Sequence, residues 1–229
     1  MKKAALVLKN PKKMVFMKKQ LVENGLVYDA KNPDFVVSLG GDGTFLISER
    51  KYPGIPKLII RDSKICYKCV GTDEKTIFQL IKEGKYEIVP EPKIEVKFKG
   101  ESLFAVNDVI LRNKNPNQAI RLRLKGKKEH DEMIGDGIVV STPFGSTAYY
   151  KSITGKTFNS GMSVAFNNPT EKHAPIFFSE KDVLKVKLIR GNAHLAADNN
   201  PRMMTVKEGE SLTIKRAKQN TLLLITKIK

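Results

Sequence analysis

The sequence predicts an α/β plus β protein, with a Rossmann-like parallel α/β domain in residues 1–90 and a β-rich, sandwich-like domain in residues 91–218. In the first third, buried apolar runs alternate with helical patterns, which implies a parallel sheet with helices on its faces. From Ile94 onward the segments are short, and several alternate apolar and polar residues, as in antiparallel sheets with one solvated face. Pro90 and Pro92 mark the boundary.

The first domain is expected to begin strand, helix, strand, helix. Asn10 and Pro11 form a helix start, and Gly25 ends that helix. A short helix is expected to open at Thr44, and another, capped by Asp73, to end before Gly84. Strands are predicted at residues 4–8, 35–39 and 57–60.

The second domain is read as a series of short strands. The last of these, about 219–229, is expected to return to the first domain. The predicted strands cover residues 94–98, 103–111, 119–125, 137–142, 183–189, 194–198, 211–216 and 221–228.

Composition limits the class of protein and of partner. The 229 residues are 41% hydrophobic, which favours a packed globular chain. A net charge of +17 attracts anions, whether nucleic acid, anionic membrane or phosphorylated metabolites. The basic residues are dispersed, so no nucleic-acid-binding tail is predicted. No apolar run approaches the ~20 residues of a membrane span, and the N-terminal run is too short for a signal peptide. We expect a cytoplasmic protein that does not bind membranes.

Two cysteines, Cys66 and Cys69, form a single C-x-x-C motif. Such a pair can be half of a zinc site, a redox pair, a disulfide or simply two thiols beside a turn. Because His130, His173 and His194 are scattered along the chain, the last interpretation is favoured. No zinc site is predicted.

The motif GGDGT at residues 40–44 follows a buried strand and opens a helix. Ligands of parallel α/β folds bind at such junctions, and the glycines and the helix N-terminus suit a phosphate. The motif matches neither a Walker A loop nor G-x-G-x-x-G. Asp42 either accepts a proton from an attacking hydroxyl, holds Mg²⁺ against phosphate, or caps the helix.

Two further segments carry polar side chains within apolar surroundings. Residues 135–152, GDGIVVSTPFGSTAYYKS, combine hydroxyls, small residues and two tyrosines, which suit sugars and bases but also fit an ordinary hairpin. Asn107 and Asp108 interrupt an apolar run. At least one of the two is expected in a buried or cleft environment, unless the pair lies on a solvent-facing edge strand.

In their order and separations, these three elements resemble the NAD kinase family. GGDGT alone is shared with diacylglycerol and sphingoid lipid kinases, whereas the segment at 135–149 is more specific. The resemblance covers nearly the whole chain. It implies transfer of a phosphoryl group from ATP or inorganic polyphosphate to the 2′-hydroxyl of the adenosine ribose of NAD, giving NADP.

The resemblance also implies roles for individual residues. Asp42 would accept the proton of the acceptor hydroxyl and, with Gly43, would contact NAD. Asp136 would reach the nicotinamide end across a subunit interface in a homodimer or homotetramer. Mg²⁺ or another divalent cation is implied, with ligands unknown. The donor's phosphates would lie beside Gly40, Gly41, Gly43 and Thr44. The second domain would bind NAD through Asn107, Asp108, Thr147, Ala148, Tyr149, Tyr150, Lys151 and Ser152.

The sequence departs from the family pattern in three places. The segment at 61–72 lacks the Gly-Asn and the Leu-Gly-Phe-Leu that family members often carry after the third strand, so donor contacts there are not assigned. Asp108 stands where Glu is commoner. Asp198-Asn199 replaces a usual Asp-Gly turn, in which Asn199 would tolerate a left-handed conformation.

Other functions are compatible with parts of this pattern. A lipid kinase shares the GGDGT turn but needs an amphipathic acceptor surface, which the sequence does not show. A basic nucleic-acid-binding β-protein would use the positive charge and exposed rings. A catalytically silent NAD-binding relative would require a misplaced Asp42. ATP or polyphosphate, NAD or NADH, and dimer or tetramer remain open alternatives.

Overall fold

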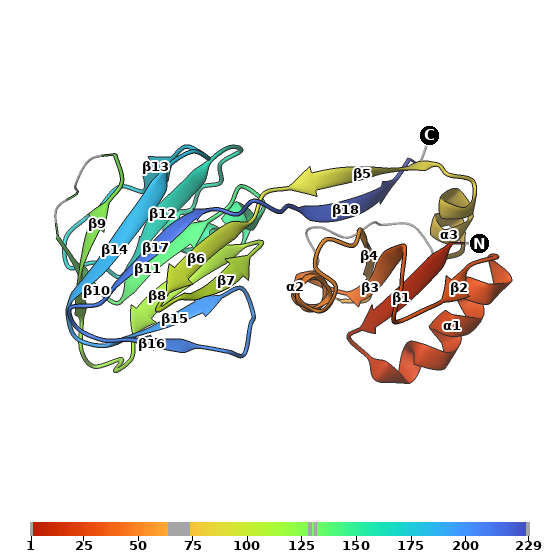
Figure 1. Ribbon diagram of the computed structural model, residues 1–229, viewed down its shortest axis with the longest axis horizontal. Coiled ribbons are helices and arrows are strands. Elements are labelled where there is room, and N and C mark those ends of the chain that lie inside the picture. Colours follow the sequence, from red (N-terminus) through yellow and green to blue (C-terminus); the bar gives the residue numbers. More distant parts are fainter. Residues whose placement is uncertain (1, 64–73, 128–129, 131, 228–229) are drawn as a thin grey trace. The chain divides into compact units, whose positions relative to one another are not determined.

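Figure 1 shows the computed structural model, which describes residues 2–63, 74–127, 130 and 132–227. The chain forms two compact units, residues 1–91 with 220–229, and residues 92–219. The first contains strands and helices and the second is almost entirely β, so the predicted fold class is confirmed. Cys66, Cys69, Asp73 and most of the segment 61–72 lie outside the described residues.

The first unit is built on a six-stranded sheet in the order β2-β1-β3-β4-β18-β5. Neighbouring strands are parallel from β2 to β18, and β5 is antiparallel to β18. The short β2 and the edge strand β5 were not predicted. The strands are β1 (Lys3–Leu8), β2 (Val27–Tyr28), β3 (Phe35–Gly40), β4 (Lys57–Arg61), β5 (Tyr86–Glu91) and β18 (Thr221–Thr226).

Three α-helices pack on this sheet: α1 (Met14–Glu23), α2 (Asp42–Lys51) and α3 (Glu74–Lys82). A 3₁₀ turn, Pro11–Lys13, precedes α1, and the Asn10 side chain accepts a hydrogen bond from the Lys12 N–H at 3.1 Å, as expected for a helix start. Helices α1 and α3 bury residues such as Leu21 and Phe78 against one face of the sheet. Helix α2 packs on β1, β3 and β4.

The second unit consists of two six-stranded antiparallel sheets. The β9 sheet has the order β10-β9-β14-β17-β6-β7 and the β11 sheet the order β13-β12-β11-β8-β15-β16. The strands of the β9 sheet are β6 (Ile94–Phe98), β7 (Glu101–Ala105), β9 (Ile120–Lys125), β10 (Met133–Gly135), β14 (Val183–Arg190) and β17 (Ser211–Arg216). Those of the β11 sheet are β8 (Asp108–Asn113), β11 (Gly137–Ser141), β12 (Met162–Asn167), β13 (Ile176–Phe178), β15 (Ala193–Ala197) and β16 (Met204–Val206).

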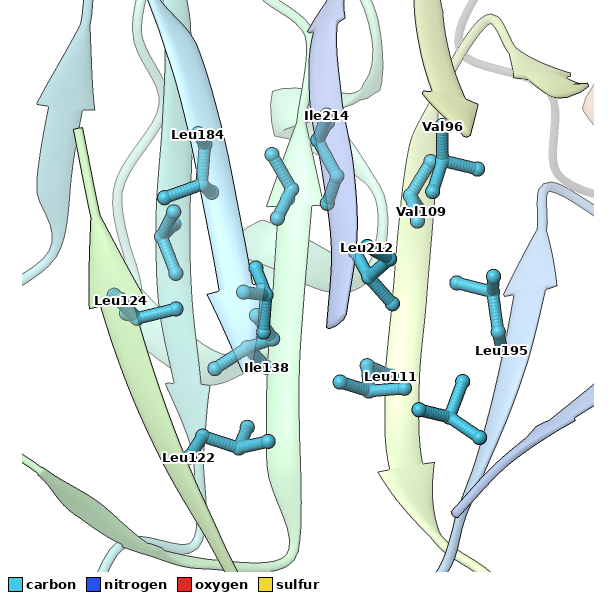
Figure 2. Close-up of a cluster of buried hydrophobic side chains, with 14 of the residues drawn as sticks. Val96, Val109, Leu111, Leu122, Leu124, Ile138, Leu184, Leu195, Leu212 and Ile214 are labelled. Carbon is cyan, nitrogen blue, oxygen red and sulfur yellow. The ribbon is translucent and has the colours of Figure 1, made fainter. Parts of the chain in front are cut away.

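The core of this unit lies between the two sheets. Alternate residues of each strand point inward, so that Leu122, Leu184 and Ile214 of the β9 sheet meet Leu111 and Ile138 of the β11 sheet (Figure 2). Each fully buried aliphatic side chain contributes roughly 1.5–3 kcal/mol relative to an exposed one. The alternation predicted from the sequence therefore specifies which face of each sheet is dry.

Two expectations for this unit were wrong in detail. The single strand expected at 103–111 is two strands, because the chain leaves the β9 sheet at Ala105 and enters the β11 sheet at Asp108. The segment 135–152 is not a plain hairpin, since a 3₁₀ turn (Gly145–Thr147) and helix α4 (Tyr149–Thr154) follow β11. The short strands β10, β12, β13 and β16 were not predicted.

Candidate active site

The GGDGT turn connects β3 to α2 at the carboxyl end of the parallel strands. Gly41 is the N-cap in an extended conformation, and its carbonyl accepts hydrogen bonds from the N–H groups of Thr44 at 2.9 Å and Phe45 at 3.2 Å. The helix begins at Asp42, two residues before the expected start at Thr44, because the chain can turn helical directly after the extended Gly41. Asp42 therefore lies half-buried in the first turn of the helix, where the helix dipole stabilises an anion.

Gly40 has a packing reason to be glycine. A Cβ atom at this position would overlap the Oγ1 and Cβ atoms of Thr44, whose side chain is buried. A larger residue would have to displace Thr44 and with it the first turn of α2. The close approach fixes how the helix N-terminus leaves the strand.

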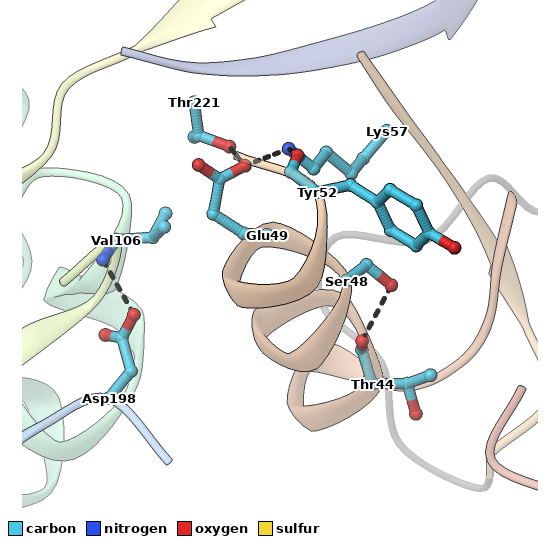
Figure 3. A network of polar contacts seen from close by, with 8 residues as sticks. All are labelled: Thr44, Ser48, Glu49, Tyr52, Lys57, Val106, Asp198 and Thr221. Carbon is cyan, nitrogen blue, oxygen red and sulfur yellow. Dashed lines mark hydrogen bonds and ion pairs between the residues drawn. The ribbon is translucent and has the colours of Figure 1, made fainter. Parts of the chain in front are cut away.

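The other end of α2 is held by a buried ion pair (Figure 3). Lys57 at the start of β4 is 0% exposed and contacts Glu49, which is 4% exposed. The Lys57 ammonium also donates to the carbonyl of Tyr52 at 2.6 Å, and the Thr221 hydroxyl donates to the Glu49 carboxylate at 2.6 Å. These contacts connect α2 to β4 and β18. The sequence interpretation missed them, because Lys57 reads as the edge of an apolar run.

In the second unit, Asp198 organises the crossing between β7 and β8. Its carboxylate accepts hydrogen bonds from the N–H groups of Val106 at 2.8 Å, Asn107 at 2.8 Å and Asp108 at 3.1 Å. Figure 3 shows the first of these three. These N–H groups lie where the chain changes sheets, so strand pairing does not satisfy all of them. Asp198, not Asn199, has the left-handed backbone, with φ +49°. The expected turn is present with its strained residue one position earlier.

The crossing is also joined to the loop after β11. Thr142 donates its N–H to the Asn107 carbonyl at 2.9 Å and its hydroxyl to the Val106 carbonyl at 2.5 Å. A Cβ at Gly145 would overlap the backbone of Asn107, so only glycine fits there. The structure thus brings the Asn107–Asp108 pair and the STPFGST segment together. The sequence shows them as two separate motifs and does not reveal this contact.

Asp108, which is buried, and Asp198, which is half-buried, are two acids close to each other. Burial, and after it the neighbouring Asp198 charge, raise the pKa of Asp108 to about 7. Burial also raises the pKa of Asp198, against three backbone N–H hydrogen bonds that lower it. Asp108 is 5% exposed, so the expectation that this pair enters a buried environment is correct for Asp108.

We expect the free energy of unfolding to depend on the protonation of Asp108. A carboxyl group whose pKa is raised from near 4 in the unfolded chain to about 7 in the folded protein binds its proton more tightly when folded, so stability falls as pH rises from 4 to 7. Asp108→Asn should remove this loss and gain on the order of a few kcal/mol relative to wild type over that interval. Urea unfolding followed by circular dichroism at several pH values measures the difference, with exposed Glu171→Gln as control. A difference independent of pH would contradict the assignment.

Asp136 lies between β10 and β11, next to two asparagines. Asn113 and Asn168 each donate a side-chain N–H to its carboxylate, both at 3.3 Å. The Asp136 carbonyl accepts the N–H of Asn113 at 2.8 Å. These contacts orient the half-buried carboxylate, which is away from the hydrogen bonds that join Asn107 to Thr142.

The residues of the 147–152 segment differ in exposure. The Tyr150 ring is 1% exposed and packs with Val139 and Ala165, and its hydroxyl is 2.9 Å from the Ser163 hydroxyl. Thr147, Ala148 and Tyr149 are half-buried, and Lys151 and Ser152 are exposed. Tyr150 thus anchors α4, while its neighbours face outward.

Two absences can be stated for the part of the chain that the structure describes. It contains no group of three or more His, Cys, Asp or Glu residues placed to hold a metal ion. It also contains no helix with the length and apolar character needed to span a membrane.

Comparisons with known proteins identify the family to which the chain belongs. The family model for the C-terminal domain of ATP-NAD kinase matches residues 106–226, more than half of the chain. NAD kinase 1 of Oceanobacillus iheyensis is 32% identical over 154 residues, which are 61% of this chain and 57% of that protein. The NAD kinase of Sulfurisphaera tokodaii is 29% identical over 219 residues, 90% of this chain and 87% of the relative. A crystal structure of an NAD kinase from Archaeoglobus fulgidus in complex with ATP shares the fold, with a TM-score of 0.83 at 20% identity, covering 96% of this chain and 92% of that one. The chain belongs to the NAD kinase family.

Proposed function

We propose that the protein transfers a phosphoryl group to the 2′-hydroxyl of the adenosine ribose of NAD, with ATP or inorganic polyphosphate as donor. The observation that carries this proposal is the position of Asp42, at the first residue of α2 between glycines at the end of β3. Family membership supports an enzyme of this class, a phosphotransferase with an alcohol acceptor.

In this proposal the GGDGT turn performs the chemistry. Phosphoryl transfer depends on in-line positioning and charge stabilisation. The N–H groups at the start of α2 would bind the donor's phosphates beside Thr44, and Gly41 and Gly43 would leave room for them. Gly40 would also lie beside the phosphates, with the space that a Cβ would take filled by Thr44. Asp42 would orient the acceptor hydroxyl and take its proton, a contribution typically of ~10²–10⁴-fold.

The dinucleotide would be held by the second unit. Asn107 and Asp108 would hydrogen-bond NAD, and the Asp198 carboxylate fixes the backbone that carries both. Thr147, Ala148, Tyr149, Lys151 and Ser152 would line the adenosine subsite. Tyr150, being buried, would position its neighbours on α4 rather than touch the ligand.

The remaining parts of the proposal concern the cation, the assembly and the location. Mg²⁺ usually binds few carboxylates together with substrate phosphates, and a half-buried acid beside a phosphate cradle fits that chemistry; the ion would neutralise charge on the donor. Asp136, oriented by Asn113 and Asn168, would serve the nicotinamide end of a site completed by a second subunit in a homodimer or homotetramer. The proposed location is the cytoplasm.

The test is NADP formation by the purified protein from NAD and Mg²⁺, with ATP and polyphosphate supplied separately. Product with either donor is expected and identifies that donor. The same assay with NADH, and with a diacylglycerol in vesicles, distinguishes the alternative acceptors. Binding of NAD without product from any donor would overturn the proposed reaction. The protein would then be a catalytically silent NAD-binding member of the family.

A further inference from the structure

The outward face of the β9 sheet contains a hollow of about 500 Å³. Its lining combines aliphatic stems with positive charge: six of the thirteen residues are Lys or Arg, and none is Asp or Glu. The lining consists of Lys97, Phe98, Lys99, Gly100, Ser102, Arg123, Lys125, Lys185, Val186, Lys187, Ser211, Leu212 and Thr213. All of them lie in residues 92–219, and none belongs to the proposed active site.

Like charges oppose each other directly in this hollow. Lys185 on β14 is paired in register with Lys125 on β9, and Lys187 with Arg123. Side chains at opposed positions of antiparallel strands lie on one face, and like charges there destabilise the sheet. Folding gains nothing from this arrangement, so an anionic ligand is its simplest physical reason.

Some of these cations already have acidic partners and some do not. Arg123 contacts Glu132 at 2.6 Å, Lys99 contacts Glu210 at 2.7 Å, and Lys97 contacts Glu95 at 3.7 Å. Among the described residues, Lys125, Lys185 and Lys187 form no ion pair with an acid. These three ammonium groups, on two adjacent strands, are therefore available to a ligand.

The register places the ligating groups in a line across the strands. One row runs from β9 to β7 and carries Lys125, Lys185, Thr213, Lys97 and Ser102. Its last two members also contact the Glu95 carboxylate, Lys97 at 3.7 Å and the Ser102 hydroxyl at 2.8 Å, so Lys125, Lys185 and Thr213 are the main groups left for a ligand. Five strands with spacings of about 4.8 Å make this row ~19 Å long. A flexible linear anion can lie along it and meet a cation or a hydroxyl at each strand.

We propose that this face binds inorganic polyphosphate at a site separate from the GGDGT turn. Lysine ammonium groups bind phosphate as compact point charges without requiring one orientation, which suits a chain of repeated phosphate units. The one aromatic residue of the lining, Phe98, is buried, so the hollow offers no ring on which nucleic-acid bases could stack. The exposed ring of Phe104 lies outside the lining.

The test is a titration of the whole chain with inorganic polyphosphate of defined length. Isothermal titration calorimetry measures the affinity at several salt concentrations. The triple variant Lys125→Gln, Lys185→Gln, Lys187→Gln should bind about tenfold or more weakly. It should also lower the slope of log affinity against log salt by about 2–3, one unit or slightly less for each lost phosphate contact. A control triple, Lys31→Gln, Lys75→Gln, Lys172→Gln, removes the same charge from exposed positions elsewhere and should bind within about twofold of wild type, beyond the weak general effect of net charge.

The two triple variants separate the proposal from general basicity. Equal weakening in both would overturn the site, because affinity would then follow net charge alone. Single-stranded DNA binding this face as tightly as polyphosphate of equal charge would overturn the choice of ligand. The replaced lysines of both variants are exposed, so the control variant should unfold at the same urea concentration as wild type. The site variant, which loses opposed like charges, should unfold at the same or a higher concentration, so binding is measured on folded protein in both cases.

Discussion

Asp42→Asn is expected to lower the rate of NADP formation by about 10²–10⁴-fold. The variant should fold like wild type, and its affinity for NAD should stay within about threefold of the wild-type value. The carboxylate lies in the first turn of α2, directly after β3. Asparagine keeps the size of the side chain and its ability to hydrogen-bond a hydroxyl, but it cannot accept the proton. The measurement is steady-state kinetics with saturating donor, together with a separate NAD-binding titration.

A second helix provides the matched control for the loss of charge. Glu74 occupies the first turn of α3, so Glu74→Gln removes a negative charge from an equivalent place in a helix dipole. Each variant should lose about 0.3–1 kcal/mol of stability, and only Asp42→Asn should lose turnover. An Asp42→Asn enzyme with a near-wild-type rate would eliminate the proton-acceptor role, whereas a rate lost together with NAD binding would indicate a binding role instead.

The sequence predicted well those elements whose pattern is local. The run FVVSL followed by glycines gave β3 and the turn after it, because a buried parallel strand is continuously apolar. Asn10 and Pro11 predicted the start of the first helix, because the capping hydrogen bond joins Asn10 to a residue only two positions further along the chain. Strands of the second unit were found where polar and apolar residues alternate, as in β9 and β14.

The features that the sequence did not predict depend on contacts between residues far apart in the chain. The bend that divides 103–111 into β7 and β8 depends on Asp198, which is 92 residues from Val106, so no local signal marks it. The run LFAVNDVIL is apolar except at Asn107 and Asp108, and two polar residues within such a run do not by themselves locate a change of sheet. The carboxylate of Asp198 was visible only as part of a turn, and its role became clear from the three N–H groups it binds.

The second large effect is expected in the buried pair of Lys57 and Glu49. Lys57→Met keeps the length of the side chain but removes its ammonium from a site with 0% exposure, next to a carboxylate with 4% exposure. Removing one partner of a buried pair typically costs 3–5 kcal/mol, because the other charge stays desolvated. Urea unfolding followed by circular dichroism should show this loss of stability for Lys57→Met. The control is Lys51→Met, which replaces an exposed lysine at the end of α2, the helix that carries Glu49. It should change the free energy of unfolding by no more than about 0.5 kcal/mol.

The double variant Glu49→Leu, Lys57→Met distinguishes the cost of a lone charge from the worth of the pair. Replacing both charges with apolar side chains often restores stability, but here the Tyr52 carbonyl would lose its 2.6 Å donor and the Thr221 hydroxyl its 2.6 Å acceptor, which costs about 1–3 kcal/mol per buried group. We therefore expect partial recovery, with the double variant more stable than Lys57→Met and less stable than wild type. Its turnover should stay within a few-fold of wild type, because the start of α2 is fixed separately, by the close packing of Gly40 on Thr44. A double variant as unstable as the single one would show that the hydrogen bonds to Tyr52 and Thr221, rather than the two charges, hold α2 to β4 and β18.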